Sequence, residues 1–211
     1  MTSRSAALER LSIAGPAGAL QAVAEGPLGP APDYAVVCHP HPLFGGTMDN
    51  KVVTTLVRAL HAAGIPTLRF NFRGVAQSEG AFDEGLGETA DAAAVAAYGA
   101  ARWPGRRLVL AGFSFGAYVA LRLAQQRELS RLITVAPPVE RFDFSGLAAP
   151  ACPWLLVQGD ADEVVDPHRV LAWAEALEPP PRLLIMPGVG HFFHGHLSVL
   201  RDAVVDAIRS G

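Results

Sequence analysis

The pentapeptide Gly112-Phe-Ser-Phe-Gly116 places one serine between two glycines. Residues 107–113 form a short apolar run typical of a strand, and residues 117–124 have the spacing of a helix. Ser114 therefore lies where a strand turns directly into a helix. Side chains on both sides of such a turn would collide, so glycines there leave the serine hydroxyl exposed as a potential nucleophile. A Gly-Ser turn that only joins two elements has the same pattern.

A serine hydroxyl attacks a carbonyl only with a base in hydrogen-bond reach, and that base needs an orienting group. The acidic loop 159–166 follows a strand-like run and contains Asp160, Asp162 and Asp166. Because Asp166 precedes a proline, we expect it to cap a helix. The residues alone leave Asp160 and Asp162 as alternatives for the orienting acid.

The candidate base is His191, the first histidine after the strand-like run 182–186. A loop histidine can be a solvated side chain, but the order serine, acid, histidine, each after its own strand, favours catalysis. His39, His41 and His194 also permit a metal site. The pair His191-x-x-His194 lies on a glycine-broken loop and lacks the rigid spacing of a zinc site. We therefore expect no metal and no cofactor.

Composition restricts the class of protein. The chain has 211 residues, of which 50% are hydrophobic and 18% charged, enough for a large core. Its net charge of -3 and its scattered arginines argue against a nucleic-acid surface. Two cysteines, Cys38 and Cys152, are too few for a disulfide framework, and no segment resembles a signal peptide or a membrane span. We expect a single cytoplasmic domain over residues 1–211; the oligomeric state stays open.

Strands and helices alternate along most of the chain. A predicted hairpin over 8–25 is followed by strands at 34–38, 65–72, 108–113, 132–135, 154–158 and 182–186. Helices are expected at 50–63, 88–103, after Ser114, from Pro167 and from about Leu197. Continuous apolar strands in this order predict an α/β fold with a mostly parallel sheet covered by helices on both faces. Ligands of such sheets bind beyond the carboxyl ends of the strands, where Ser114 lies.

The chain resembles the α/β-hydrolase superfamily, and more narrowly its small, lidless bacterial serine hydrolases, which are dienelactone-hydrolase-like or esterase-like. The resemblance covers nearly the whole chain from Tyr34. It is carried by five segments: HPHPLFGGTMDNKVV (39–53), RFNFRGVAQSEG (69–80), GFSFG (112–116), GDADEVV (159–165) and GHFF (190–193). The resemblance implies an α/β-hydrolase fold with Ser114 as nucleophile, His191 as base and Asp162 rather than Asp160 as the acid.

The resemblance also implies an oxyanion hole made of two backbone N–H groups. One belongs to Phe115. The other comes from the segment His39-Pro-His-Pro-Leu43, which departs from the usual His-Gly-x pattern. Prolines have no N–H, so the donor is His41 or Leu43; alignment on His39 favours His41.

Many members of the superfamily carry a cap domain after the strand that follows the nucleophile helix. Here residues 136–153 leave no room for one, so we expect an open site. The phenylalanines near the motifs are candidates for its apolar wall, with Phe44, Phe142, Phe144 and Phe192 as the pocket prediction. Further candidate phenylalanines near the motifs are Phe113, Phe115 and Phe193.

No chemical step requires Asn71, Arg73 or Glu88, for which we expect structural pairing.

The predicted function is hydrolysis of ester-type acyl bonds of small molecules through an acyl-enzyme. Thioester, lactone or peptide-type bonds are alternatives on the same triad. A hydrolase-like binding or regulatory protein is an alternative of another class, against which the intact triad argues.

Overall fold

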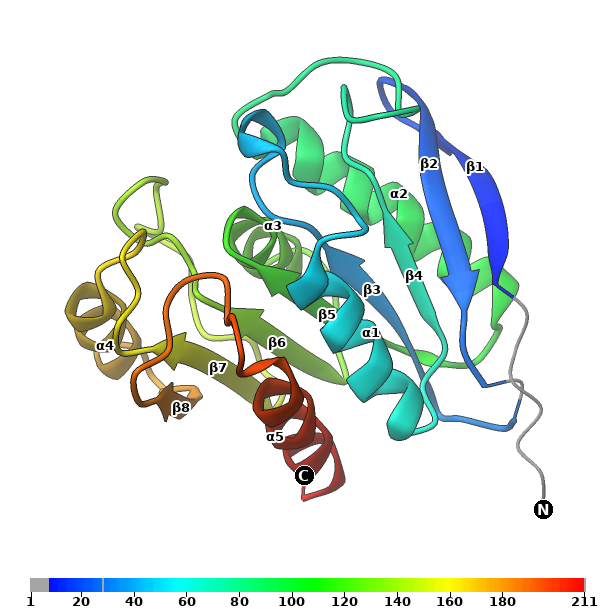
Figure 1. Ribbon diagram of the computed structural model, residues 1–211. Coiled ribbons are helices and arrows are strands. Elements are labelled where there is room, and N and C mark those ends of the chain that lie inside the picture. Colours follow the sequence, from blue (N-terminus) through cyan, green and yellow to red (C-terminus); the bar gives the residue numbers. More distant parts are fainter. Residues whose placement is uncertain (1–7, 28, 211) are drawn as a thin grey trace.

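The computed structural model describes residues 8–27 and 29–210. Residues 1–7, to which the expectation of no signal peptide partly refers, lie outside the described residues. Eight strands form one sheet in the order β1-β2-β4-β3-β5-β6-β7-β8 (Figure 1). The strands are β1 (Glu9–Gly15), β2 (Gly18–Glu25), β3 (Asp33–Cys38), β4 (Thr67–Phe70), β5 (Arg107–Phe113), β6 (Arg131–Val135), β7 (Trp154–Gly159) and β8 (Arg182–Met186).

The sheet is parallel except at one edge. β1 and β2 form an antiparallel hairpin, and β2 runs antiparallel to β4. From β4 to β8 every neighbouring pair is parallel. The predicted mostly parallel sheet with an N-terminal hairpin is therefore confirmed.

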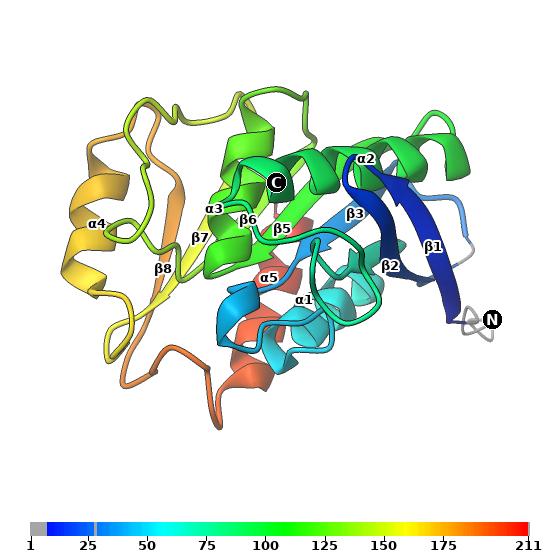
Figure 2. The same ribbon diagram turned by 90° about the horizontal axis from the view of Figure 1, so that it is seen from above.

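Helices cover both faces of the sheet, as Figure 2 shows from above. They are α1 (Lys51–Ala62), α2 (Leu86–Arg102), α3 (Phe115–Ala124), α4 (Pro167–Glu175) and α5 (Leu197–Arg209). One core lies under α1 and α5, and a second lies under α2, α3 and α4. Strand residues alternate between the two cores: Val36 and Leu110 contact one, whereas Val37 and Val109 contact the other. Burial on both faces explains why these strands are continuous apolar runs.

The direction of the connections reverses next to the nucleophile candidate. The chain leaves β3 through α1 to β4 on one side, and later returns through α2 to β5 on the other side of β3. Such a change of direction opens a crevice at the carboxyl ends of the two central strands, where ligands bind in open α/β sheets. Cys38 ends β3 and Phe113 ends β5, so Ser114 directly follows one of these two central strands.

Several boundaries differ from the predicted ones by one or two residues, and two of these differences have local reasons. α2 begins at Leu86, two residues before the predicted start, because the Glu88 carboxylate accepts hydrogen bonds from the backbone N–H groups of Gly85 (2.7 Å) and Asp83 (2.9 Å). A side chain at the third helical position that reaches back in this way satisfies free N–H groups of the first turn. β4 ends at Phe70, and the N–H of Phe72 bonds to a histidine ring instead of a strand.

None of the helices within residues 8–27 and 29–210 has the length and apolar character that crossing a lipid bilayer requires.

Candidate active site

The turn at Ser114 joins β5 to α3 with no intervening loop. Ser114 has φ 54° and ψ -119°, a conformation that is costly for a residue with a side chain. A side chain at Gly112 would collide with the carbonyl oxygen of Gly116, and one at Gly116 would collide with that of Cys38. The Ser114 N–H donates to the Val135 carbonyl at 2.8 Å, which ties the turn to β6. Both glycines are therefore required for this turn.

Ser114, His191 and Asp162 form a hydrogen-bonded chain. His191 Nε2 lies 3.1 Å from Ser114 Oγ, and His191 Nδ1 lies 2.8 Å from Asp162 Oδ2. Each side chain follows the carboxyl end of a different strand, β5, β8 or β7. The carboxylate can only accept, so Nδ1–H donates to it and leaves the Nε2 lone pair facing the serine hydroxyl.

Asp162 is held as a carboxylate by four donors. Its Oδ1 accepts from the backbone N–H groups of Val164 (2.9 Å) and Val165 (2.8 Å), and its Oδ2 accepts from Gln158 Nε2 (3.1 Å) besides His191. Burial alone would raise the pKa of this carboxyl, but the hydrogen bonds from His191, Val165 and Val164 outweigh it and hold the pKa below its usual value. Asp162 is therefore ionised beside the histidine.

The other acids and histidines that the sequence offered lie elsewhere. Asp160 is exposed and accepts from the Gly188 N–H at 2.6 Å, and Asp166 caps α4 by accepting from the His168 N–H at 2.9 Å. His194 is exposed. Among the described residues, no three histidines, cysteines or carboxylates converge as metal ligands. Of the two acids left open by the residues alone, the structure brings only Asp162 to His191.

His39 is fully buried and links the segments that follow β3 and β4. Its Nδ1–H donates to the Pro40 carbonyl at 2.6 Å, and its Nε2 accepts from the Phe72 N–H at 3.0 Å. Burial lowers the pKa of His39 to about 4; the bond to Pro40 opposes this, and His41 adds to it. A neutral imidazole satisfies both backbone groups, so this histidine is structural.

The buried His39 predicts a pH dependence of stability. Between about pH 6.5 and about pH 4 the unfolded chain binds a proton at His39 that the folded chain does not. The free energy of unfolding should therefore fall as the pH is lowered through this window, by on the order of 3 kcal/mol from this group. Urea unfolding at about pH 7 and about pH 4 measures the effect, and His39→Gln should flatten the slope of the unfolding free energy against pH. Equal slopes in the variant and the wild type would contradict this prediction.

Two backbone N–H groups lie beside the turn. Phe115 is the first residue of α3, so its N–H has no partner within the helix. Among residues 8–27 and 29–210, none accepts a hydrogen bond from the N–H of Phe115 or of His41. The Leu43 N–H, in contrast, donates to Nδ1 of His41 at 3.2 Å. Because Gly116 lies against the carbonyls of Cys38 and His39, the start of α3 directly abuts the segment that leads to His41.

An open groove of about 670 Å³ borders the start of α3. We call it the aromatic groove. Its lining contains the rings of His41, Phe44, Phe82, Tyr118 and Phe142, the aliphatic Leu86, and the charged Glu84, Arg141 and Asp143. Phe115, next to Ser114, contacts the rings of His41, Phe82 and Phe142 with centroids 5.1, 5.7 and 5.2 Å away. Three rings that line the groove therefore pack on the buried side chain that follows the serine.

The predicted pocket residues divide between three places. Phe44 and Phe142 line the aromatic groove. Phe192 is exposed and is not part of the groove lining; its ring meets that of His191 edge-on, with centroids 5.1 Å apart. Phe144 is buried against Tyr118 and the Trp173 ring, so it belongs to the core rather than to the groove. Of the further candidates, Phe113 and Phe193 are fully buried core residues, and Phe113 packs on the His191 ring.

Asn71, Arg73 and Glu88 have structural partners. Asn71 Oδ1 accepts from the Met48 N–H at 2.8 Å, which anchors the segment before α1. Arg73 forms two side-chain hydrogen bonds, of 2.7 and 3.0 Å, with the buried carboxylate of Asp91. Glu88 caps α2, as described above. These residues hold the loops around the site.

Sequence reasoning missed several residues of the site. Gln158 was read only as the end of a strand, but its amide donates to Asp162. Tyr118 and Phe82 line the groove without having been singled out. Tyr118 could have been found, because it lies four residues after Ser114 and therefore on the same helix face. Phe82 comes from a loop that no local pattern connects to the site.

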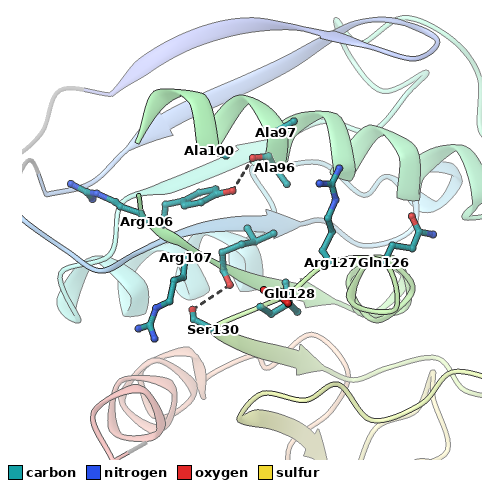
Figure 3. A pocket seen from close by; sticks show the side chains of 12 residues that line it. Ala96, Ala97, Ala100, Arg106, Arg107, Gln126, Arg127, Glu128 and Ser130 are labelled. Carbon is teal, nitrogen blue, oxygen red and sulfur yellow. Dashed lines mark hydrogen bonds between the residues drawn. The ribbon is translucent and has the colours of Figure 1, made fainter. Parts of the chain in front are cut away.

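A second cavity, of about 570 Å³, lies at the other end of the sheet (Figure 3). It is bordered by the start of β5 and by the segment after α3, away from the strand ends that carry Ser114, Asp162 and His191. Its labelled arginines, Arg106, Arg107 and Arg127, point in different directions (Figure 3). They do not converge on a common point as the donors of an anion site would.

The chain has clear relatives. Residues 36–196 match the family described as an alpha/beta hydrolase domain. An α/β serine hydrolase without lid from Xanthomonas campestris is 48% identical with a TM-score of 0.93, covering 96% of this chain and 94% of that one. An α/β serine hydrolase homologue from Coxiella burnetii is 44% identical with a TM-score of 0.91, covering 98% of both chains.

An uncharacterized protein of Rickettsia prowazekii is 35% identical over 202 residues, which are 91% of this chain and 85% of that protein. The family match spans most of the sheet, and the structural relatives extend the similarity to nearly the whole chain. The chain belongs to the α/β-hydrolase superfamily, as its motifs predict.

Proposed function

We propose that this protein is a serine hydrolase that cleaves ester-type acyl bonds of small substrates through an acyl-enzyme. The hydrogen-bonded chain of Ser114, His191 and Asp162 is the observation that carries the proposal. Serine hydrolases among its structural relatives support hydrolase activity in general. The ester bond and the roles of the three residues are inferred from the geometry.

In the first half-reaction Ser114 Oγ attacks the carbonyl carbon of the ester and passes its proton to His191 Nε2. Asp162, an ionised carboxylate, stabilises the imidazolium that forms and fixes its orientation. The backbone N–H groups of Phe115 and His41 donate to the developing oxyanion. When the tetrahedral intermediate collapses, the bond to the alcohol oxygen breaks and His191 protonates the departing alcohol.

In the second half-reaction water attacks the acyl-Ser114 ester. His191 Nε2 accepts a proton from this water, and the same oxyanion donors stabilise the second tetrahedral intermediate. Collapse releases the carboxylic acid, and the proton returns to Ser114 Oγ. The free enzyme is restored, so the reaction consumes only ester and water.

We also propose that the reaction takes place in the cytoplasm on a small-molecule substrate. Cys38 and Cys152 are both free thiols, which suits a reducing compartment. The net charge of -3 gives no support to a nucleic-acid partner.

Rapid-mixing kinetics with p-nitrophenyl acetate test this function. An acyl-enzyme whose hydrolysis limits turnover releases p-nitrophenol in a burst equal to the enzyme concentration, followed by a slower steady rate. The control is the same protein after heat denaturation. Release no faster than in this control would contradict the proposal.

The absence of a cap predicts a preference for short aliphatic acyl groups. Residues 136–153, between β6 and β7, form a loop too short to be a domain. Each buried methylene adds about 0.8 kcal/mol of binding where walls surround the chain, and that gain should stop once the chain leaves the groove for water. Catalytic efficiency on p-nitrophenyl esters of about two to sixteen carbons should therefore peak at short chains. A steady rise to long chains, or a jump at the micelle threshold, would contradict the open site.

A further inference from the structure

We propose that the aromatic groove binds the acyl part of the substrate and selects acyl groups that carry an aromatic ring. This inference rests on the proposed function and adds a substrate class to it. Three observations carry it: the composition of the groove, its position relative to Ser114, and its position relative to His191.

The composition of the groove favours a planar apolar ring. Phe142 stacks on Tyr118 with centroids 4.9 Å apart and an interplanar angle of 24°, and its centroid lies 5.8 Å from that of His41. Phe44, at 78% exposed, has its centroid 4.7 Å from the His41 ring. Such large exposed apolar side chains at a groove mark a surface that a ligand covers. A substrate ring can add to this cluster in the offset or edge-on arrangements that aromatic pairs prefer.

The ring of His41 is held in a neutral form that suits such contacts. Burial lowers its pKa, and the Arg141 guanidinium lowers it further. Its Nδ1 accepts from the Leu43 N–H, so this nitrogen carries no proton. His41 therefore offers a flat neutral ring to the groove, while its backbone N–H is the proposed oxyanion donor. The groove thus starts at the oxyanion donors.

The position of His191 decides which part of the ester enters the groove. His191 protonates the departing alcohol, so the alcohol part must lie beside its ring. That ring contacts Phe113 and Phe192, each with centroids 5.1 Å away, whereas the rings of the groove pack on Phe115. With the carbonyl oxygen between the N–H groups of Phe115 and His41, the alcohol side faces His191. The other substituent of the carbonyl carbon, the acyl group, then faces the groove.

The test compares p-nitrophenyl phenylacetate, cyclohexylacetate and acetate, which share one leaving group. We expect kcat/KM for phenylacetate to exceed that for cyclohexylacetate by about tenfold, the magnitude of aromatic contacts beyond burial. Phe142→Ala and Phe44→Ala should each bring this ratio towards one. Leu43→Ala is the matched control: Leu43 directly precedes Phe44 and is exposed, but its side chain is not part of the groove lining, so the variant should leave the ratio unchanged. Equal kcat/KM values for phenylacetate and cyclohexylacetate in the wild type would overturn the proposal. So would a ratio that neither groove variant changes.

A second comparison separates the acyl part from the alcohol part. Phe142→Ala should lower kcat/KM for ethyl phenylacetate and spare benzyl acetate, measured by titrating the released acid. The opposite pattern would place the alcohol in the groove and overturn the acyl assignment.

Saturation-transfer NMR with 2-phenylacetamide detects binding of a ring in the groove without requiring turnover. We expect Phe142-dependent transfer to its ring, and its absence would overturn the inference whatever the activity. If this transfer is seen but no ester is hydrolysed, the proposed function fails and the ring-binding groove stands.

Discussion

Replacement of Ser114 by alanine is expected to reduce kcat/KM for p-nitrophenyl acetate by on the order of 10³-fold or more, because the loss of a triad member removes the nucleophile. The fold should persist. Among the residues that the structure describes, the Ser114 side chain hydrogen-bonds to His191 alone, and alanine can adopt the backbone conformation of Ser114 at a similar cost. Steady-state kinetics, with thermal unfolding as the check on the fold, measure both effects.

A folded Ser114→Ala variant that hydrolyses the ester at a rate near that of the wild type would show that another group is the nucleophile. Because Ser114 lies in a turn held by Gly112 and Gly116, a variant at either glycine is not a suitable control: a side chain there collides with backbone. Alanine at Ser114 itself is the smallest change that removes the hydroxyl.

Asp162→Asn should reduce kcat by about 10⁴-fold, whereas Asp160→Asn should change it little. Asparagine at position 162 keeps the shape of the side chain, but its amide favours the wrong tautomer of His191 and so places a proton on Nε2. Asp160→Asn is the matched control, because it makes the same substitution at a different position. Asp160 lies two residues earlier in the same loop, is exposed, and accepts from Gly188 rather than from His191.

Kinetics of the two asparagine variants on p-nitrophenyl acetate, at equal protein concentration, make this comparison. If Asp160→Asn were the more damaging of the two, the acid of the triad would be misassigned. Thermal unfolding of both variants separates a loss of chemistry from a loss of structure, since Asp162 also accepts from the N–H groups of Val164 and Val165.

The fold could be predicted because its signals are local. The strands are continuous apolar runs, and both glycines of the Ser114 turn are imposed by backbone contacts that any side chain would break. The start of α2 was misplaced by two residues because Glu88 acts through its side chain on residues before it, which propensity alone does not reveal. The cap of α4 at Asp166 was predicted because proline follows it at once.

The candidate site could be predicted only in part. The choice between Asp160 and Asp162 is a question of which carboxylate the loop turns inward, and that is set by two N–H donors at Val164 and Val165. The aromatic groove was harder still. Its rings come from segments near residues 41–44, 82, 118 and 142, which only the folded sheet brings together. Residue type alone does not identify the groove residues: Phe144 is only two residues from Phe142, yet it packs in the core.

The nucleophile can be identified by peptide mapping with mass spectrometry after reaction with a fluorophosphonate, because this reagent phosphonylates an activated serine. If Ser114 is the nucleophile, the folded protein gains one adduct per chain, located on Ser114, and no adduct forms in heat-denatured protein or in Ser114→Ala. We also expect a much slower reaction in Asp162→Asn, where His191 no longer activates the hydroxyl. An adduct on another residue, or no adduct on the folded wild-type protein, would contradict the assignment of Ser114 as an activated nucleophile.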